Sequence, residues 1–358
     1  MQLSNVSFRV GSQTWLHTLN LSFAPGLNVL LGSTLAGKTT LMRVMAGLEQ
    51  PATGRVLIDD RDVTGVPVRE RNLAMVYQQF INYPSMSVYD NIASPLRLAK
   101  VPKPTIDERV RSLAETLRLT AFLDRRPAEL SGGQQQRTAL ARALAKDAQL
   151  VLLDEPLVNL DYKLREDLRL ELKQLFAQRR TTVVYATTEP QEALQLGGNT
   201  VVLSEGRAIQ SGPTLDVFRR PATLEAARAF SDPPMNELRA QLDPSKGAVM
   251  LPEGLRVPLP TQAIRALTEA SRDVVLGIRA HQLALTPSDT TVSVSGRVDL
   301  AEISGSETYL HLSRGELSLV ARLAGIHDLA LGEQCTLHFD PADVYCFDDH
   351  GRLVFAPE

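Results

Sequence analysis

The sequence predicts an α/β core with a parallel sheet, followed by a small β-barrel. Short, continuous apolar runs recur in the first part of the chain, as expected of parallel strands that are buried on both faces. They lie at residues 27–31, 150–153 and 182–185. Helical stretches alternate with them, at residues 39–48, 107–119 and 164–178. This alternation is typical of an α/β fold, because each parallel strand needs a crossover connection to the next.

A change from alternating strands and helices to short β-like runs marks the predicted domain boundary. The segment Ser231-Asp232-Pro233-Pro234 disfavours helix because proline lacks a backbone N–H. We therefore expect one domain over residues 1–232 and another over residues 236–358. The second domain carries short β-like runs separated by turn residues, a spacing that predicts a small barrel. The runs lie at residues 274–278, 292–298, 309–312, 317–321, 334–339 and 353–355.

Composition narrows the classes of partner. Of the 358 residues, 44% are hydrophobic and 22% are charged, which suffices to build sizeable cores. The formal net charge is -3, so the chain lacks the surplus of basic residues that is typical of nucleic-acid-binding proteins. We therefore expect no nucleic-acid partner. The two cysteines, Cys335 and Cys346, lack the spacing of a metal site and are interpreted as reduced thiols.

Neither secretion nor membrane insertion is expected from the sequence itself. The first five residues are polar and carry no basic region before an apolar stretch, unlike a secretory signal. No segment reaches the roughly 18 uninterrupted apolar residues that span a bilayer. Any link to a membrane is therefore expected to go through other chains.

The first motif with chemistry is a loop between the first predicted strand and its helix. It fits the Walker A pattern of phosphate-binding loops. Backbone N–H groups and the helix N-terminus would cradle phosphate, Lys38 would add a charge, and Thr39 would ligate Mg²⁺. A glycine turn that merely precedes a helix is the alternative. The predicted cradle comprises Gly32, Ser33, Thr34, Leu35, Ala36, Gly37, Lys38, Thr39 and Thr40.

The second motif is an apolar run that ends in two acidic residues, at positions 150–155, and it resembles a Walker B strand. Asp154 would hold Mg²⁺, directly or through water, and Glu155 would polarise the attacking water. Strands often end in acidic residues, so this motif alone is weak evidence. The Walker A loop upstream makes the Walker B interpretation the favoured one.

The third motif, Leu-Ser-Gly-Gly-Gln at residues 130–134, is the most discriminating. Ser131 supplies a hydroxyl, while Gly132 and Gly133 leave backbone N–H groups open at the start of a helix. Together with Gln134 they predict a second grip on the γ-phosphate. An ordinary helix cap by Ser131 is the alternative, and it is compatible with this role.

With this signature the sequence resembles ABC ATPases of the maltose- and glycerol-3-phosphate-importer type, over nearly the whole chain. The resemblance implies a P-loop ABC-type ATPase core with a helical subdomain at about residues 82–149, and an OB-like regulatory β-barrel after it. It implies ATP and Mg²⁺ as cofactors. It also implies a head-to-tail dimer, in which each ATP lies between the Walker A loop of one subunit and the signature of the other.

Further residues of the site are assigned by the resemblance alone. Gln78 matches the glutamine that contacts Mg²⁺ or the attacking water, and a surface glutamine is the alternative. With Thr39 and Asp154 it completes the expected metal ligands, and with Glu155 it belongs to the expected catalytic residues. Residues 159–161 match the loop that crosses the dimer interface, where isolated residues would indicate only a turn.

Two more regions match family segments outside the nucleotide site, namely the contact with the membrane subunits and the regulatory barrel. Residues 80–92, including Tyr83 and Tyr89, match the region that receives the coupling helix of the membrane subunits. Ordinary packing of aromatic side chains is the alternative there. Residues 276–279 and 339–343 resemble stretches of the regulatory barrel.

Three positions depart from the family pattern. Leu35 stands where the family usually has glycine. The aromatic residue that usually stacks on adenine aligns near Val10, and either Phe8 or Trp15 could substitute for it. The switch histidine, the third expected catalytic position, is replaced by Thr188, which cannot carry a positive charge to the γ-phosphate.

From these residues we expect an ATP-hydrolysing subunit of an importer for a sugar, a polyol or glycerol 3-phosphate. It would lie peripherally on the cytoplasmic face of the cell (inner) membrane, bound to two integral-membrane permease subunits. The second ATPase would be an identical copy or a sister chain, and an extracytoplasmic solute-binding protein would be an indirect partner.

Two other functions compete with this hypothesis. A degenerate, nucleotide-sensing subunit paired with an active sister ATPase is favoured by Thr188, whereas Lys38 and Glu155 argue against it. A soluble ABC ATPase of translation or DNA repair usually has two cassettes or a long coiled coil. This chain has one cassette and no heptad tract.

Overall fold

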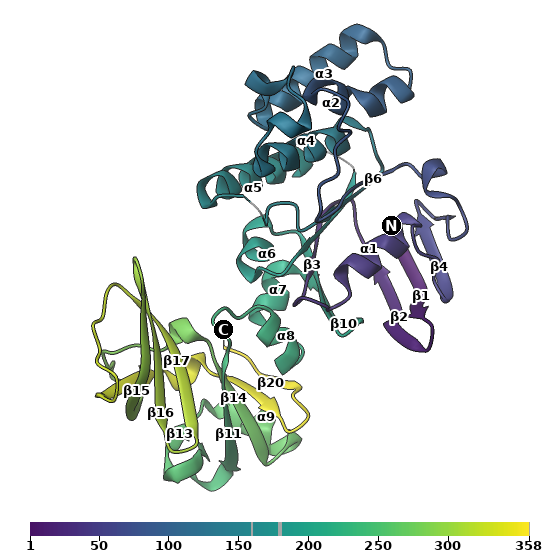
Figure 1. The fold of residues 1–358 in the computed structure, drawn as a ribbon. Coiled ribbons are helices and arrows are strands. Elements are labelled where there is room, and N and C mark those ends of the chain that lie inside the picture. The colour runs from purple at the N-terminus through teal and green to yellow at the C-terminus, as the bar shows by residue number, and fades with distance from the viewer. Residues whose placement is uncertain (159, 178–180, 358) are drawn as a thin grey trace. The chain divides into compact units, whose positions relative to one another are not determined.

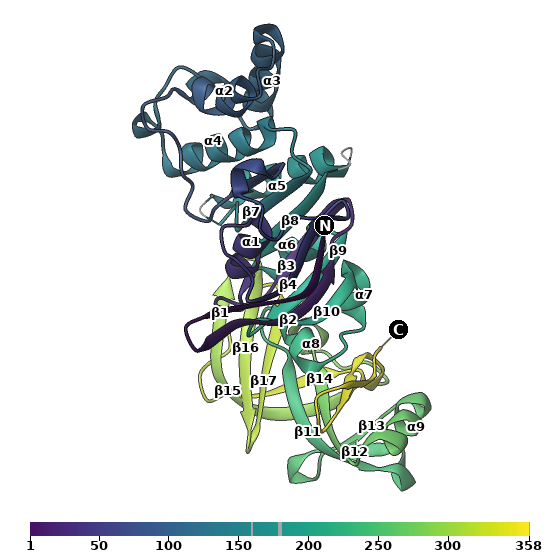
Figure 2. The ribbon, with the colours of Figure 1, turned by 90° about the vertical axis from the view of Figure 1, so that its right-hand side faces the viewer.

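The computed structural model describes residues 1–158, 160–177 and 181–357. Its contacts divide the chain into two compact units, Met1–Thr214 and Leu215–Glu358 (Figures 1 and 2). The predicted α/β core followed by a small β domain is confirmed. The division precedes the proline pair at 233–234, because the segment before the prolines packs with the second unit.

The first unit is built on a six-stranded sheet. Strands β3, β6, β7, β8 and β9 run parallel, and β10 pairs with β9 in the antiparallel sense. Every residue of β7 and β8 is buried, as the continuous apolar runs predict. The carboxyl ends of β3, β6, β7 and β8 therefore meet at one edge of the sheet. In spatial order the strands are β10 (Arg207–Pro213), β9 (Asn199–Ser204), β3 (Gly26–Leu31), β8 (Thr182–Thr187), β7 (Leu150–Asp154) and β6 (Leu73–Val76).

A four-stranded antiparallel sheet accompanies the parallel one, and the sequence analysis did not predict it. Helix α1 (Lys38–Ala46) shares one apolar core with strands of both sheets, through side chains such as Leu41, Met42 and Met45. This packing fixes where the phosphate loop before α1 lies. In spatial order the strands are β2 (Gln13–Ser22), β1 (Gln2–Val10), β4 (Thr53–Ile58) and β5 (Arg61–Asp62).

Helices α2 to α4 gather at one end of the first unit (Figure 1). They fall inside the predicted helical subdomain at about residues 82–149, and α2 contacts both α3 and α4. Helices α5 and α6 follow β7 and β8, as the crossover pattern requires. The bounds are α2 (Val88–Leu98), α3 (Lys103–Thr116), α4 (Gly132–Ala145), α5 (Tyr162–Ala177) and α6 (Pro190–Leu196).

The second unit consists of two antiparallel sheets around one apolar core, and the six-stranded one curves as a half-barrel. The six-stranded sheet is β13 (Arg256–Pro258), β12 (Ala248–Met250), β11 (Asn236–Asp243), β14 (Asp273–Ile278), β19 (Tyr345–Asp348) and β20 (Leu353–Phe355). The four-stranded sheet is β17 (Leu317–Ala324), β16 (Glu307–Arg314), β15 (Val292–Ser304) and β18 (Gln334–Phe339). The helices are α7 (Thr214–Arg219), α8 (Leu224–Ala229) and α9 (Thr261–Ala270).

Buried Arg279 ties the helices of this unit to its sheet. Its guanidinium lies 4.0 Å from the ring centroid of Phe218 and donates to the carbonyl oxygen of Phe218 at 2.8 Å. It also donates to the carbonyl oxygen of Phe230 at 3.3 Å. These contacts explain why α7 and α8 group with the strands of the second unit.

Both cysteines are free thiols in the second unit, as predicted. Cys346 is buried, and burial raises its pKa to about 12. Cys335 is half-buried, and its pKa is raised, again chiefly by burial. Among the described residues, no helix combines the length and the apolar content that crossing a bilayer requires.

Candidate functional site

The loop between β3 and α1 holds the predicted phosphate cradle. Gly32 follows β3, and a Cβ there would lie 2.2 Å from the carbonyl oxygen of Leu203, so only glycine fits. Gly37 precedes α1 with φ 99°, and no side chain among the described residues caps the helix. Backbone N–H groups at such a helix start are available to an anion.

Leu35 occupies an unusual conformation in this loop. Its φ is 68°, in the left-handed region that favours glycine, and its side chain is 85% exposed. For an ordinary L-residue this conformation costs on the order of 1–2 kcal/mol. The surrounding loop therefore determines the backbone conformation of Leu35, and its side chain faces solvent.

Lys38 is buried at the start of α1, and its ammonium group is held by the loop it belongs to. Its Nζ donates to the carbonyl oxygens of Gly32 at 2.9 Å and Ser33 at 3.0 Å. It lies 3.4 Å from a carboxylate oxygen of Glu155. Burial lowers the pKa of Lys38, while Glu155 acts in the opposite direction. A cation placed among carbonyl groups at a helix N-terminus is well suited to bind phosphate.

Asp154 ends β7 and is almost completely buried. Burial is the main reason that its pKa is raised, and a hydrogen bond with the Thr39 side chain opposes the shift. Its Oδ1 finds no hydrogen-bond partner within the part of the chain that the structure describes. A buried, unsatisfied carboxylate oxygen beside a hydroxyl fits a hard divalent cation such as Mg²⁺.

Glu155 connects two of the predicted motifs. It follows β7 with φ 47°, and its backbone N–H donates to the carbonyl oxygen of Ala186 at 3.1 Å. Gln78, which follows β6, donates from Nε2 to Glu155 Oε2 at 3.2 Å. The structure thus brings together Lys38, Asp154, Glu155 and Gln78 at the carboxyl edge of the parallel sheet.

The signature residues lie at the start of α4, in the helical part of the unit. Ser131 Oγ accepts from the N–H of Gln134 at 3.3 Å, and Gln134 Oε1 accepts from the N–H of Ser131 at 2.9 Å. This reciprocal pair is the predicted cap. Gly133 lies close to Leu160, since a Cβ built on Gly133 would lie 3.1 Å from Cδ2 of Leu160.

Three family models match the chain. The model described as ABC transporter matches residues 16–158, which contain all three motifs. The models described as MalK OB fold domain and TOBE domain match residues 232–283 and 276–347, in the second unit. The predicted OB-like character of the second unit is therefore confirmed.

Two known proteins match almost end to end. The trehalose/maltose import ATP-binding protein MalK of Thermococcus litoralis is 38% identical over 362 residues, covering 96% of each chain. The sn-glycerol-3-phosphate import ATP-binding protein UgpC of Salmonella typhimurium is 38% identical over 339 residues, covering 94% of each chain. The chain is an ATP-binding member of the ABC transporter family.

A solved structure supports the same assignment for the first unit. The dimeric, post-hydrolysis ATP-binding cassette MJ0796, bound to ADP and Pi, is 27% identical and superposes with a TM-score of 0.54. It covers 60% of this ABC ATPase and 98% of its own chain. The ABC ATPase domain binds ATP, and the geometry above identifies the region in which this chain would do so.

The switch position that the resemblance assigns to this ABC ATPase lies in the loop between β8 and α6. Thr188 lies there half-buried. The hydroxyl of its neighbour Thr187 is engaged, because it donates to Glu192 at 2.6 Å and accepts from the N–H of Glu189 at 3.0 Å. The backbone oxygen of Thr187 accepts from the N–H of Gly32 at 3.3 Å, which joins this loop to the phosphate loop.

The loop expected to cross a dimer interface is described only in part. Asn159 lies outside the described residues. Asp161 Oδ1 accepts from the N–H of Leu164 at 3.0 Å and so supports the first turn of α5.

The aromatic side chains near the phosphate loop differ in exposure. Phe8 is buried in the core of the first unit, so it is not available to stack on adenine. Val10 is 57% exposed but has no ring, and Trp15 is 40% exposed. Trp15 precedes Leu16, whose Cδ2 lies 3.1 Å from a Cβ built on Gly37, so the tryptophan belongs to a segment that contacts the phosphate loop.

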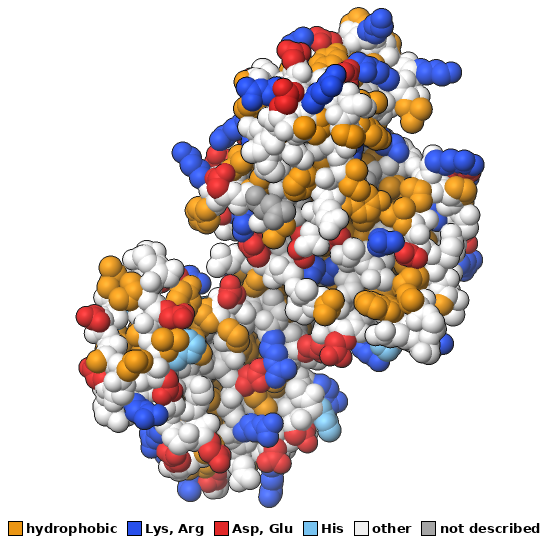
Figure 3. Space-filling view, in the orientation of Figure 1, with side chains coloured by type: hydrophobic (Ala, Val, Ile, Leu, Met, Phe, Trp, Pro, Cys, Tyr) orange, Lys and Arg blue, Asp and Glu red, His pale blue; other side chains and the backbone are white. Residues whose placement is uncertain are grey.

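A hollow of about 230 Å³ opens beside the predicted membrane-subunit contact. Tyr83 and Leu98 line it, together with Arg142 and Lys146. The guanidinium of Arg142 lies 4.7 Å from the ring centroid of Tyr83. Hydrophobic side chains gather on the face of the unit that Figure 3 presents near β6. Tyr89, the other predicted aromatic, instead interacts with Asp107 of α3.

The two cations of this hollow are held by neutral groups. Arg142 donates to the carbonyl oxygen of Ile81, and Lys146 donates to that of Leu73 at 2.7 Å. No carboxylate in the described part of the chain forms a salt bridge with either one. Burial lowers the pKa of both.

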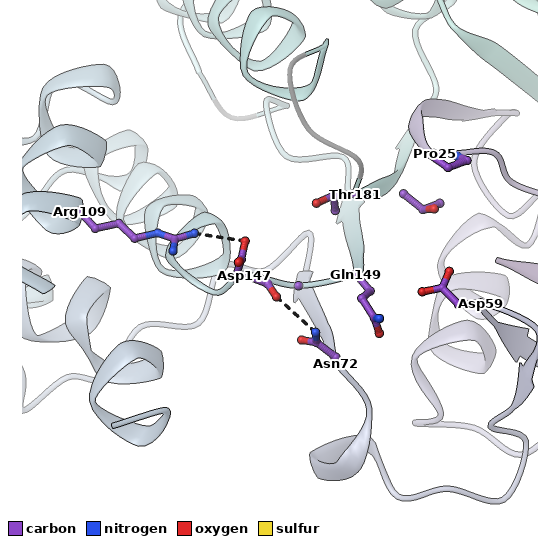
Figure 4. A pocket seen from close by; sticks show the side chains of 9 residues that line it. Pro25, Asp59, Asn72, Arg109, Asp147, Gln149 and Thr181 are labelled. Atoms are coloured by element: carbon purple, nitrogen blue, oxygen red, sulfur yellow. Dashed lines mark hydrogen bonds and ion pairs between the residues drawn. The ribbon is translucent and has the colours of Figure 1, made fainter. Parts of the chain in front are cut away.

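A larger pocket, of about 580 Å³, lies at the opposite edge of the parallel sheet (Figure 4). Its lining includes Gln149 and Thr182, next to or at the amino ends of β7 and β8. Asp147 accepts there from Asn72 through its carbonyl oxygen and lies 3.6 Å from Arg109. Because phosphate ligands of parallel sheets bind at the carboxyl ends, this pocket is not the nucleotide site.

The sequence analysis missed a residue that connects parts of the site. Arg165, on α5, pairs with Glu189 of the switch loop at 2.7 Å. No local pattern announces this contact, because the two residues are 24 positions apart. Only the fold brings them together.

Proposed function

We propose that this chain is the ATP-binding and ATP-hydrolysing subunit of an importer for a sugar, a polyol or glycerol 3-phosphate. The observation that carries the proposal is the convergence of Lys38, Asp154, Glu155 and Gln78 at one edge of the sheet. The names of these two relatives describe import ATP-binding proteins, one for trehalose/maltose and one for sn-glycerol 3-phosphate. Their full-length similarity supports the class of solute.

Phosphate binding falls to the loop of residues 32–40. Its backbone N–H groups and the start of α1 supply neutral donors, and Lys38 supplies the charge that offsets the phosphates. Thr39, Asp154 and Gln78 would hold Mg²⁺, which neutralises negative charge on the phosphate oxygens when it is bound. The unsatisfied oxygen of Asp154 supports this assignment.

Hydrolysis requires a water molecule oriented toward the γ-phosphate. Glu155 would accept its proton or polarise it, and Gln78 would orient both through its bond to Glu155. Thr188 would donate one neutral hydrogen bond to the developing negative charge. Because the charged and acidic residues are all present, turnover is favoured over the alternative of a subunit that only senses nucleotide.

Recognition of the base is proposed to fall to Trp15. It is exposed, adjoins the phosphate loop through Leu16, and is the one tryptophan of the sequence. A stacked adenine would therefore change the intrinsic tryptophan fluorescence.

A second ATPase chain is the first expected partner. The signature residues 131–134 would grip the γ-phosphate held by the Walker A loop of that chain, and the dimeric cassette of similar fold supports the arrangement. The second chain can be an identical copy or a sister subunit.

Two membrane permease subunits are the other expected partners, on the cytoplasmic face of the cell membrane. The hollow lined by Tyr83 and Leu98 offers apolar surface, and Arg142 and Lys146 offer two cations that form no salt bridge with any described carboxylate. A short permease helix with apolar side chains and one acidic residue fits this combination. The solute-binding protein would contact only the permeases.

Replacing Lys38 by alanine tests the proposal. Without its charge, nucleotide affinity should fall by roughly tenfold or more, since charge-assisted hydrogen bonds contribute about 1.5–3 kcal/mol. Calorimetry with an ATP analogue measures this, and tryptophan fluorescence provides a second readout. Lys246→Ala, a surface lysine of the second unit paired with Asp243, is the control and should bind as wild type. Equal affinity of Lys38→Ala and wild type would overturn the phosphate-site assignment.

A further inference from the structure

The switch loop is anchored on one side by a buried polar cluster. Thr187 and Tyr185 both donate to Oε2 of Glu192, at 2.6 and 3.2 Å. Thr187 also accepts from the N–H of Glu189, so its hydroxyl holds the backbone that follows Thr188. All donors and acceptors named here are satisfied by one another, as buried groups require.

On the other side, the same loop is held by a single guanidinium. Glu189 Oε1 accepts from Arg165 Nη1 at 2.7 Å. Arg165 Nη2 donates in turn to the carbonyl oxygens of Val158 and Leu160, at 3.2 and 3.4 Å. The side chain of Arg165 is 22% exposed and that of Glu189 is 42% exposed, so solvent partly screens this pair.

The carbonyl oxygens of Val158 and Leu160 belong to the segment between Glu155 and α5. That segment starts at the residue that would polarise water, and Leu160 packs against Gly133 of the signature. The switch loop, for its part, is bonded to Gly32 through Thr187. Arg165 therefore donates hydrogen bonds to two parts of the site. One is the segment whose Leu160 packs against the signature, and the other is the switch loop, which is bonded to the phosphate loop.

We propose that Arg165 is a positioning residue for ATP hydrolysis, which holds Thr188 in register with the segment after Glu155 through its fork of bonds to Glu189, Val158 and Leu160. The planar guanidinium suits this task because its donors point in fixed directions. A lysine could reach Glu189 or the carbonyl groups but could not span them with the same geometry. The proposal deepens the proposed function and rests on it.

Steady-state ATPase kinetics of the full chain test the bridge. In Arg165→Gln and in Glu189→Ala we expect kcat to fall by about tenfold, since small misplacements of reacting groups are costly. KM and the affinity for an ATP analogue should stay within about twofold, because neither residue contacts the phosphate loop. The double variant should lose no more than either single one, because both remove the same bridge. Arg165→Lys should recover only part of the rate.

The control is Asp167→Ala, on the same helix as Arg165, which removes the ion pair of Asp167 with Arg118, also at 2.7 Å. It should leave both kcat and KM unchanged. If Arg165→Gln does not fold, Glu189→Ala decides, because it removes the acceptor at a side chain that is 42% exposed. Wild-type kcat in Glu189→Ala, or a change confined to KM, would overturn the bridge. An inactive wild-type chain, in contrast, would count against the proposed function itself.

Discussion

At the scale of single residues, the proposed nucleotide site depends on how Glu155 is held. Its two carboxylate oxygens face different groups, the Lys38 ammonium at 3.4 Å and the Gln78 amide at 3.2 Å. Its backbone sits at φ 47°, a conformation that the hydrogen bond from its N–H to Ala186 helps to maintain. Two side-chain contacts and one backbone hydrogen bond thus hold Glu155 in place.

Glu155→Gln is expected to separate binding from hydrolysis. The amide keeps the size of the side chain but cannot accept a proton, so kcat should fall by about 10²–10⁴-fold. The affinity for ATP should be retained, because the phosphate loop is untouched. Phosphate release and equilibrium binding are the two measurements.

Glu253→Gln is a matched control for this experiment. Glu253 also has a positive φ, 60°, but it lies in the second unit beside Arg314. It should hydrolyse ATP as wild type does. Full turnover by Glu155→Gln would mean that a different residue activates the water.

Thr188→His is expected to accelerate hydrolysis. A histidine would donate a stronger hydrogen bond to charge that develops on the γ-phosphate, and such contacts contribute up to about 10²-fold in rate. The steady-state ATPase rate of the purified chain is the measurement, with the exposed Thr268→His as control. An unimproved, rapid wild-type rate would indicate that the bridge at Glu189 already compensates for the missing histidine.

How far residues could be predicted depends on whether their partners are close in sequence. The phosphate loop and the signature are each one contiguous segment, so Lys38 and Ser131 were predicted from local patterns. The bond between Gln78 and Glu155 spans 77 positions, and Gln78 was assigned only by resemblance. Arg165 was not predicted, because its partners meet only in the folded chain.

At the scale of elements, helix α4 combines stability with function. Ser131 and Gln134 cap each other, and the same N-terminus carries the proposed second grip on phosphate. Helix α2 has a comparable cap without that role, since Ser87 Oγ accepts from the N–H of Asp90 at 3.0 Å. The pair of helices offers a way to separate the two effects.

Ser131→Ala and Ser87→Ala should lower stability to a similar extent. Loss of a cap costs about 1 kcal/mol, or about 2–4 °C in the midpoint of thermal unfolding for a unit of this size. Only Ser131→Ala should also lower the ATPase rate. Equal rates in the two variants would mean that Ser131 serves only as a helix cap.

In the first unit the fully buried strands β7 and β8 were predicted, whereas β2, in which burial alternates, was missed. Strands β7 and β8 are buried at every position, which gives an uninterrupted apolar run. Strand β2 alternates between exposed and buried residues and is interrupted by polar ones, so it lacks such a signal. The whole antiparallel sheet of residues 2–62 escaped prediction for this reason.

At the scale of the whole molecule, each unit has its own apolar core. The first core includes Leu30, Leu41 and Val184, and the second includes Leu276, Leu310 and Phe339. The sequence indicated both units through the change from helix-rich to strand-rich segments. It could not place α7 and α8, because the contacts of Arg279 that hold them are long-range.

Tyr83→Ala is expected to weaken assembly with the membrane subunits while ATP binding stays intact. A buried aromatic anchor contributes more than about 1 kcal/mol to an interface, so affinity should fall by roughly tenfold. Co-purification with the permeases and solute uptake in vesicles are the measurements. Tyr309→Ala, in the second unit, serves as control. Unchanged assembly and uptake in Tyr83→Ala would place the contact surface elsewhere.

The state of the two thiols makes the chain convenient for site-directed labelling. Maleimide-type probes react with the thiolate, which Cys346 scarcely forms with a pKa of about 12, and the pKa of half-buried Cys335 is raised as well. A cysteine introduced at Tyr162, which is 78% exposed just after the 159–161 loop, would therefore react first. A single fluorophore could then report on that loop during turnover in the otherwise native sequence.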